Sequence, residues 1–356
     1  MQYNMTMSES CNDNRHIASG ITSFVPVSIC HLRSRFEAGR ALSAHFSLTE
    51  NLSRNLSYIC ALHHATWNTN TLHICVIMGV GGNKMIIREI GSRDYLAKSK
   101  LGDLCINPYA GCEHACIYCY AYYMAKWSGH EGEPWGSFVD VKWADKKIDH
   151  KKIKGRNLQI GTVTDPYQPA EKRYRVTRWI LEQLVGAECK IQIITKGALV
   201  SRDVDLFKKI GETSDLRIMV SVNTLDEEVR RTLDRSSPVA DKLRALKEVH
   251  DAGIKTGVFI APILIGVTDW REIIERTRSY VGEYWFETLS CGGSYKRDML
   301  RWVLWNHREL WDVYHDIYVD GKFDEMYKLA QEIEDYCKEQ GIKGNFGGLY
   351  PHHLTV

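Results

Sequence analysis

The stretch CEHACIYC at residues 112–119 places three cysteines within eight residues. The gaps between them are three and two residues, and the aromatic Tyr118 precedes the last cysteine. Thiolates bind iron–sulfur clusters, and a cluster of four irons normally takes four of them. Cys112, Cys116 and Cys119 would supply three, so one iron would stay open for a chelating substrate. The stretch therefore predicts a [4Fe–4S] cluster with a chemical role, and Tyr118 is placed to cover it.

Zinc is the alternative metal for this stretch. Together with Cys105 or His114, the three cysteines would offer four ligands. Structural zinc sites usually carry two pairs of cysteines at C-x2–4-C spacing, however, and only one such pair is visible here. The spacing favours the cluster, and a zinc-binding module without radical chemistry is the alternative.

The C-x3-C-x2-C motif with an aromatic residue before its third cysteine resembles the hallmark of the radical S-adenosylmethionine (SAM) superfamily. The resemblance implies an enzyme whose open iron is chelated by the amino and carboxylate groups of SAM. Such an enzyme cleaves SAM reductively to a radical that abstracts hydrogen from a substrate. Residues 107–109, 162–169, 195–196 and 261–263 look like the branch related to spore photoproduct lyase, often labelled DNA repair photolyase-like. The resemblance covers roughly residues 95–269.

Composition excludes several other classes of protein. The 356 residues carry a net charge of +2, which gives no bulk attraction to nucleic acid or membrane. Eleven cysteines without regular spacing argue against a disulfide scaffold and for a reducing cytoplasm. No stretch approaches the ~20 apolar residues of a membrane span. We expect a cytoplasmic protein with no membrane partner.

The pattern divides the chain into three parts. Residues 1–83 are rich in Ser, Asn and His with weak periodicity, which predicts a poorly structured or accessory segment, or residues that belong to the gene model only. Residues 84–295 should form the catalytic domain. Residues 296–356 should form a C-terminal helical extension, in which aromatic residues at near-helical spacing predict a core stripe.

Within 84–295, short β-branched runs alternate with helical patterns, which is typical of parallel strands joined by crossovers. The first strand, 104–107, follows a lead-in strand at 85–90 and precedes a helix at 116–127. The later strand and helix pairs are 158–163 with 171–185, 191–195 with 202–210, 218–222 with 238–252, 255–260 with 270–281, and 285–289 with 296–315. These six units predict an α/β fold with a partial (β/α)6 barrel, which is also the architecture of the resembled family.

Ligands of such barrels gather at the carboxyl ends of the strands. Thr164 and Asp165 follow the second strand, Lys196 ends the third, and Ser221 and Asn223 end the fourth. The local alternative for several of these residues is helix capping. The resemblance implies that Lys196 and Ser221 hold the SAM carboxylate, with Thr164 and Asp165 at the methionine end and Asn223 toward the ribose.

One position departs from the resembled family. True spore photoproduct lyase has, at the end of the second strand, a cysteine that returns a hydrogen atom to the product radical, and the matching residue here is Thr162. A hydroxyl is a poor hydrogen-atom donor. Cys105, Cys189 and Cys291 do not obviously replace the missing thiol. The sequence therefore predicts an enzyme that does not repair spore photoproduct.

The partners of the protein are less well defined by the sequence. Residues 142–156 contain seven Lys or Arg and two Asp at 145 and 149, and such a run either forms a solvated face or binds phosphates. The solvated face is favoured, and a nucleic acid is one candidate substrate beside a peptide or a small molecule. The resemblance implies a reductant such as flavodoxin or ferredoxin, and chemistry of the lyase or transferase type.

Overall fold

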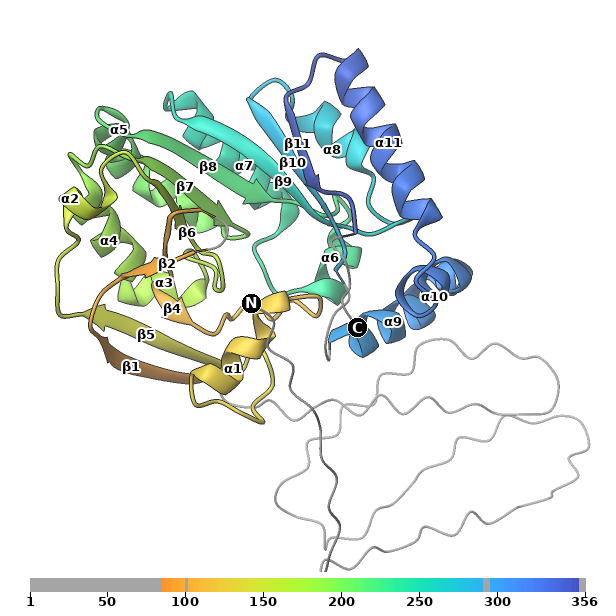
Figure 1. Cartoon of the computed structure of the whole chain (residues 1–356), viewed down its shortest axis with the longest axis horizontal. Coiled ribbons are helices and arrows are strands. Elements are labelled where there is room, and N and C mark those ends of the chain that lie inside the picture. Colours follow the sequence, from red (N-terminus) through yellow and green to blue (C-terminus); the bar gives the residue numbers. More distant parts are fainter. Residues whose placement is uncertain (1–84, 100–101, 291–294, 352–356) are drawn as a thin grey trace, which may run out of the picture. The chain divides into compact units, whose positions relative to one another are not determined.

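The computed structural model describes residues 85–99, 102–290 and 295–351 of the chain (Figure 1). The expectation for residues 1–83 and the position of Cys291 lie outside these ranges. The predicted division after residue 295 falls at the first residue of α9 (Tyr295–Asn306), where a C-terminal group of helices begins.

The main sheet has eight strands in the order β11-β10-β9-β8-β7-β6-β3-β2. All neighbours are parallel except β2 and β3. The bounds are β2 Leu96–Lys98, β3 Leu104–Ile106, β6 Asn157–Ile160, β7 Lys190–Thr195, β8 Asp215–Ser221, β9 Lys255–Ile263, β10 Glu283–Thr288 and β11 Gly344–Gly348. The six predicted strands lie side by side in chain order, which confirms the α/β architecture. Within the described ranges the sheet stays open, with β2 and β11 at its edges (Figure 1).

Helices connect the parallel strands as crossovers. They are α3 Pro169–Tyr174, α4 Val176–Leu184, η2 Ala198–Asp203, α5 Val204–Gly211, α6 Glu227–Leu233, α7 Val239–Asp251 and α8 Trp270–Thr277. The single helix predicted over 171–185 is wrong, because Arg175 takes a left-handed conformation with φ of 56° and separates α3 from α4. The Glu171 carboxylate stabilises this break by accepting from the backbone N–H groups of Thr177 and Arg178.

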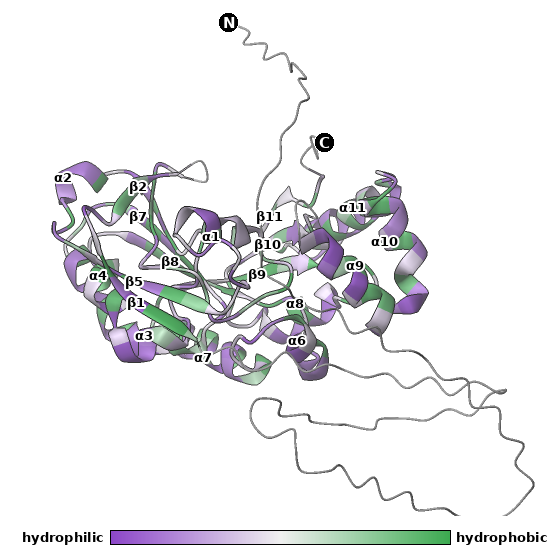
Figure 2. Cartoon of the chain, turned by 90° about the horizontal axis from the view of Figure 1, so that it is seen from below, coloured by the Kyte–Doolittle hydropathy of each residue, from purple (hydrophilic) through white to green (hydrophobic). Residues whose placement is uncertain are grey.

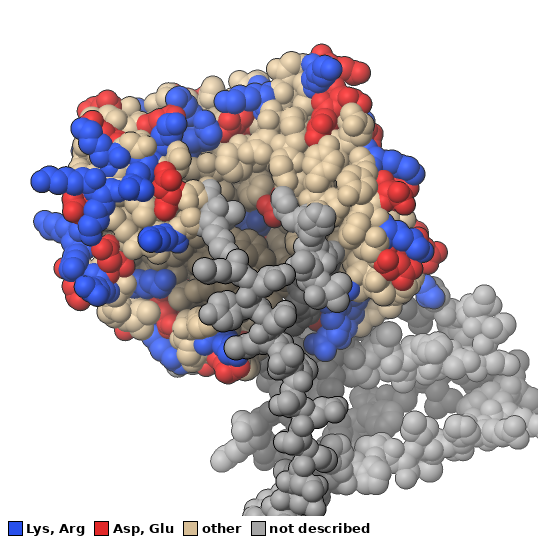
Figure 3. All heavy atoms as spheres, in the orientation of Figure 1, with Lys and Arg blue, Asp and Glu red and all other residues tan. Residues whose placement is uncertain are grey.

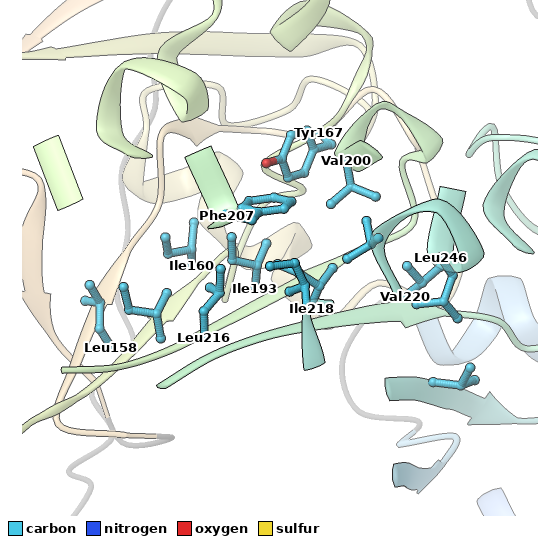
Figure 4. Close-up of a cluster of buried hydrophobic side chains, with 14 of the residues drawn as sticks. Leu158, Ile160, Tyr167, Ile193, Val200, Phe207, Leu216, Ile218, Val220 and Leu246 are labelled. Carbon is cyan, nitrogen blue, oxygen red and sulfur yellow. The ribbon is translucent and has the colours of Figure 1, made fainter. Parts of the chain in front are cut away.

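The core lies between this sheet and its crossover helices. Ile160, Ile193 and Ile218 from adjacent strands pack with Phe207 of α5 and Leu246 of α7 (Figure 4). Figure 2 shows the same division, with hydrophobic green along the strands and purple on the outer parts of helices. Strand side chains alternate between faces, so the opposite face of the sheet carries the remaining residues. These include Gln159, Gln192, Lys196, Phe259 and Trp285, all half-buried.

A second, three-stranded sheet lies next to the cysteine region. It consists of β1 Ile86–Ser92, β4 Tyr109–Ala110 and β5 Phe138–Ala144, with β5 in the middle. The predicted strand at 85–90 is therefore present but belongs to this sheet. β5 and the short helix α2, His150–Ile153, were not predicted.

The C-terminal part is helical and ends in a strand. Its helices are α9 Tyr295–Asn306, η3 Arg308–Leu310, α10 Trp311–Tyr318 and α11 Asp324–Glu339. The predicted helix over 296–315 is interrupted at η3. Trp302, Tyr314 and Tyr318 are buried in one cluster with Tyr118 of the cysteine region, whereas Trp305 is 75% exposed. Among the described helices, none has the length and apolar character needed to cross a lipid bilayer.

Candidate functional site

The cysteine loop, residues 111–119, connects β4 to the 3-10 helix η1 (Tyr120–Tyr123) and to α1 (Met124–Trp127). Two turns shape it: Ala115 N–H donates to Cys112 O at 3.3 Å, and Cys119 N–H to Cys116 O at 3.1 Å. The helix predicted over 116–127 is present but starts later than expected, because helical structure begins only at Tyr120 and runs to Trp127. The preceding residues form the two turns instead, and Ala115 takes a left-handed conformation with φ of 50°.

Two glycines allow this loop to pack against neighbouring backbone. Gly111 has φ of 83°, and a Cβ there would lie 2.3 Å from Phe138 O. Gly136, with φ of 90°, would bring a Cβ to within 2.2 Å of the Ala115 Cβ. Both positions require glycine, since an L side chain would be strained and would also clash. The start of β5 and the turn before it therefore lie directly against the cysteine loop.

The three thiols are close enough to influence one another. Burial is the main cause that raises the pKa of Cys116 well above its usual value, and the charges of Asp234, Cys119 and Cys112 add to it. Burial and the charge of Cys112 raise the pKa of Cys119 to about 12, although Lys196 and the Trp135 N–H lower it. Three adjacent thiolates repel each other unless a positive group lies between them. The donor set therefore fits a cationic metal centre.

The spacing of the thiols bears on which centre fits. Around one tetrahedral zinc ion, with Zn–S of about 2.3 Å, sulfur atoms would lie about 3.8 Å apart. Among the described residues, one group of three side chains has metal-ligating atoms that all lie within 4.8 Å of one another. It consists of His315 and Asp316 in α10 and Asp320 after it. The cysteines do not converge in this way, which fits a larger cluster better than a single ion. The two carboxylates of the α10 group are already paired with Lys322.

The turn after β6 holds the loop from one side. Thr164 donates its hydroxyl hydrogen to Gly111 O at 2.6 Å, and Gln168 Nε2 donates to Thr164 Oγ1 at 3.0 Å. Gln168 Oε1 accepts from Glu113 N–H at 2.8 Å, and Glu113 in turn accepts from the backbone of Ala170. Thr164 is buried and committed to these contacts. Sequence reasoning singled out Thr164 but missed Gln168, because no local pattern marks a residue that acts on a loop 55 positions away.

Asp165 joins three segments of the chain. Its Oδ1 accepts from Thr195 Oγ1 at 2.6 Å and from Tyr167 N–H at 2.8 Å, and its Oδ2 accepts from Lys196 N–H at 2.7 Å. His114 Nδ1 lies 3.2 Å from Oδ2. Burial alone would raise the pKa of Asp165, but His114 and these hydrogen bonds lower it to about 2. Both oxygens are occupied, so the geometry gives Asp165 a role in positioning the loop.

Lys196 follows β7 and reaches toward the thiols. Its Nζ lies 5.6 Å from the centre of the Tyr118 ring, and no carboxylate oxygen of the described residues lies within 4.0 Å of it. Burial alone would lower the pKa of Lys196, but the charges of Cys116, Asp234 and Asp165 raise it. The ammonium group is therefore charged, half-buried and available for an anionic ligand.

Ser221 ends β8, the strand paired with β7, and Asn223 follows two residues later; both are buried. The Ser221 hydroxyl makes no hydrogen bond to any described residue. Asn223 Nδ2 donates to Tyr118 OH at 3.3 Å, while its Oδ1 is buried without a partner in the described ranges. Tyr118 OH donates to Asp234 Oδ2 at 2.7 Å. A hydroxyl and an acceptor are thus open at the end of β8, and the acceptor belongs to a residue in contact with Tyr118.

Sequence reasoning also missed two charged groups behind this site. Asp234 is buried at the end of α6, where it accepts from Ser236 N–H at 2.9 Å. Lys242 of α7 is fully buried, with its Nζ 3.5 Å from Ser221 O and from Ser236 Oγ. Burial is the largest cause that lowers the pKa of Lys242 to about 8. No motif marks these residues, because Asp after a helix and Lys within one are common.

Thr162 and the thiol of Cys105 share a contact with Asn107. Asn107 Nδ2 donates to Thr162 Oγ1 at 2.9 Å and lies 3.8 Å from Cys105 Sγ. The hydroxyl of Tyr120 donates to Thr162 O. Cys189 lies before β7, at the opposite end of the sheet, and its backbone N–H donates a hydrogen bond to Ser214 Oγ at 3.3 Å. Of the two described cysteines considered as replacements for a thiol at position 162, Cys105 is the one that shares a contact with Thr162, through Asn107.

The lysine-rich run lies elsewhere. It covers the end of β5 and α2, at the edge of the sheet where Figure 3 shows Lys and Arg gathered on the left. Lys152 and Lys154 pair with Asp94 and Glu188 at 3.9 and 2.9 Å, and Lys142 is half-buried. The same figure shows a hollow near the centre of this face, well away from that edge.

Comparisons with known proteins place this site in a family. Residues 106–277, which include the cysteine loop, match the model described as "Radical SAM superfamily". An uncharacterized protein of Methanocaldococcus jannaschii, MJ0683, is 35% identical over 239 residues, which is 65% of this chain and 89% of that protein. The uncharacterized protein Rv2578c of Mycobacterium tuberculosis is 26% identical over 230 residues, 61% of this chain and 68% of that protein.

Two solved structures are similar at low identity. Spore photoproduct lyase complexed with dinucleoside spore photoproduct has a TM-score of 0.45 at 17% identity, covering 60% of this chain and 65% of that one. Streptococcus suis SuiB bound to S-adenosylmethionine has a TM-score of 0.43 at 11% identity, covering 76% and 53%. The chain thus spans less than two thirds of either protein. The resemblance found in the sequence is confirmed by the match over the cysteine loop and the strands that follow: the chain belongs to the radical SAM superfamily.

Proposed function

We propose that this protein is an enzyme that binds a [4Fe–4S] cluster through Cys112, Cys116 and Cys119 and uses it to cleave SAM. The observation that carries the proposal is the set of three thiols held in one loop, at the carboxyl end of the sheet, with the charged Lys196 beside them. When bound, the cluster and SAM supply reductive cleavage and a radical that takes hydrogen from the substrate. Membership in the superfamily implies both cofactors.

The residues of the chain would bind and orient SAM. Lys196, which lacks a carboxylate partner in the described ranges, would pair with the SAM carboxylate, and Ser221 would donate its free hydroxyl to the same group. The unpartnered Oδ1 of Asn223 would accept from a ribose hydroxyl. Thr164 and Asp165 would act through the loop that they hold. Tyr118 would exclude water from the cluster.

The substrate is proposed only by exclusion. Thr162 stands where spore photoproduct repair would need a thiol, so we propose a different reaction of the lyase or transferase type. A nucleic acid, a peptide or a small molecule would serve, and the lysines near α2 are the feature that favours a nucleic acid. The reductant would be a small redox protein such as flavodoxin or ferredoxin. A cytoplasmic location stays a prediction.

Anaerobic reconstitution tests the cofactors. We expect about four irons and four sulfides per chain, an EPR signal after reduction, and 5′-deoxyadenosine from SAM with dithionite. Ala at any of the three loop cysteines should abolish the cluster. Cys337→Ala is the matched control, because this free thiol lies in α11, away from the loop. Stoichiometric zinc without a cluster signal would instead establish the zinc-binding module.

The substrate class needs a second experiment. Reconstituted enzyme with SAM and reductant would be offered damaged DNA, RNA and cell extract in separate reactions. Formation of 5′-deoxyadenosine above the background in one of them identifies the class. Conversion of spore photoproduct to two thymines at an enzymatic rate would refute the argument from Thr162.

A further inference from the structure

Trp135 carries an N–H group that the site described so far does not use. It lies in the connection between α1 and β5, and its Nε1 is buried without a hydrogen-bond partner among the described residues. Buried N–H groups are almost always paired, because leaving one unpaired costs free energy. An unpaired one in a well-packed turn therefore points to an acceptor that completes it.

The position of Trp135 is fixed against the cysteine loop. Its neighbour Gly136 contacts Ala115 so closely that no side chain fits between them. On the other side, the Trp135 and Phe138 rings meet edge to face with centres 5.8 Å apart, and Phe138 itself packs on Gly111. The indole is thus held between the loop and the start of β5, and rotation away from the loop would break these contacts.

The candidate acceptor for this N–H is the sulfur of Cys119. The Trp135 N–H lies close enough to the Cys119 thiol to lower its pKa, although no full hydrogen bond joins the two groups in the protein as described. A sulfur that ligates iron carries more negative charge than a thiol and accepts more strongly. Loading the cluster would therefore strengthen this contact.

We propose that Trp135 donates a hydrogen bond to the Cys119 sulfur of the loaded cluster and so makes the cluster easier to reduce. Donors to cluster sulfurs stabilise the more negative, reduced state and raise its reduction potential. Trp135 is a positioning and tuning residue, since it would act through a ligand and touch no substrate. The inference rests on the proposed cluster.

Trp135→Phe tests it, because the change keeps the aromatic contact with Phe138 and removes only the N–H. The midpoint potential is measured by EPR-monitored titration. At the wild-type midpoint, the ratio of reduced to oxidised cluster should fall at least threefold, or about 28 mV for a one-electron couple. Trp143→Phe is the control, because it removes an indole N–H that donates to Glu89 at 2.9 Å, away from the loop. It should leave the potential unchanged.

A second measurement does not depend on Trp135→Phe. In wild-type protein labelled with 15N-tryptophan, pulsed EPR of the reduced cluster should detect one indole nitrogen with an exchangeable proton, and the signal should persist in Trp143→Phe. An unchanged potential in Trp135→Phe at equal iron content, or no nitrogen coupling, would overturn the inference. If Trp135→Phe takes up no cluster, the potential cannot be compared, and the nitrogen coupling in the labelled wild-type protein tests the inference. A wild type without cluster would refute the proposed function and this inference with it.

Discussion

Replacing Lys196 by Met is the sharpest test of how the site binds SAM. The substitution keeps most of the aliphatic stem and removes the charge beside the thiols. The Lys196 ammonium is half-buried, has no carboxylate within 4.0 Å in the described residues and lies over the Tyr118 ring. A ligand carboxylate would therefore gain its whole interaction with this cation and displace no existing ion pair.

The magnitude follows from the kind of contact. A hydrogen bond between charged groups contributes about 1.5–3 kcal/mol, which is about 10- to 150-fold in Kd. We expect weakening in this range when SAM binding to the cluster-loaded protein is followed calorimetrically without reductant. Lys190→Met is the matched control, since Lys190 is exposed at the opposite end of the same strand and should bind SAM like the parent. Equal affinity of Lys196→Met and the parent would refute the assignment.

Two further predictions concern stability. Lys242→Met should raise the free energy of unfolding by up to about 3 kcal/mol at pH 7. This gain should shrink by about 2 kcal/mol at pH 9.5. Between pH 8 and pH 10.5 the unfolded chain binds the lysine proton and the folded protein releases it, because burial lowers the pKa of Lys242 from 10.5 to about 8. The stability of the parent protein therefore rises with pH in this range, and its difference from Lys242→Met becomes smaller. Urea unfolding of both proteins at the two pH values checks this, and a pH-independent difference would contradict it. Gly136→Ala should cost at least ~2 kcal/mol in the same assay, since it adds a clash with Ala115 to strain at φ of 90°, whereas Gly129→Ala, with φ of 75° and open space, should cost about 1 kcal/mol. Equal costs for the two glycines would show that the contact with Ala115 is dispensable.

Local patterns predicted the parts of the fold that are themselves local. Buried parallel strands need continuous apolar runs, so stretches such as 191–195 and 255–260 were found in the right order. The cysteine spacing likewise marked the loop, because its three thiols are close in sequence and form one local motif. Lys196 and Ser221 could be chosen because the carboxyl ends of parallel strands meet at one edge.

Features that depend on distant segments escaped prediction. β11 has the sequence GNFGG, which no strand propensity favours, and it becomes a strand only by pairing with β10. A Cβ at Gly344 would lie 2.2 Å from the Phe346 ring, so packing against this ring restricts the position to glycine. Trp135 and Asp234 reach the site from 16 and 115 residues beyond Cys119, and nothing near them in the sequence indicates this.

The contacts of Asp165 make the cysteine loop and the turn after β6 inseparable. Both carboxylate oxygens are shared between the loop, that turn and the end of β7. A loop transplanted into another sheet without this turn would keep its thiols and lose their arrangement, so the two segments must be grafted as one module. Because these bonds involve only protein atoms, the same module would keep its shape after oxidative loss of the metal and could be refilled without refolding.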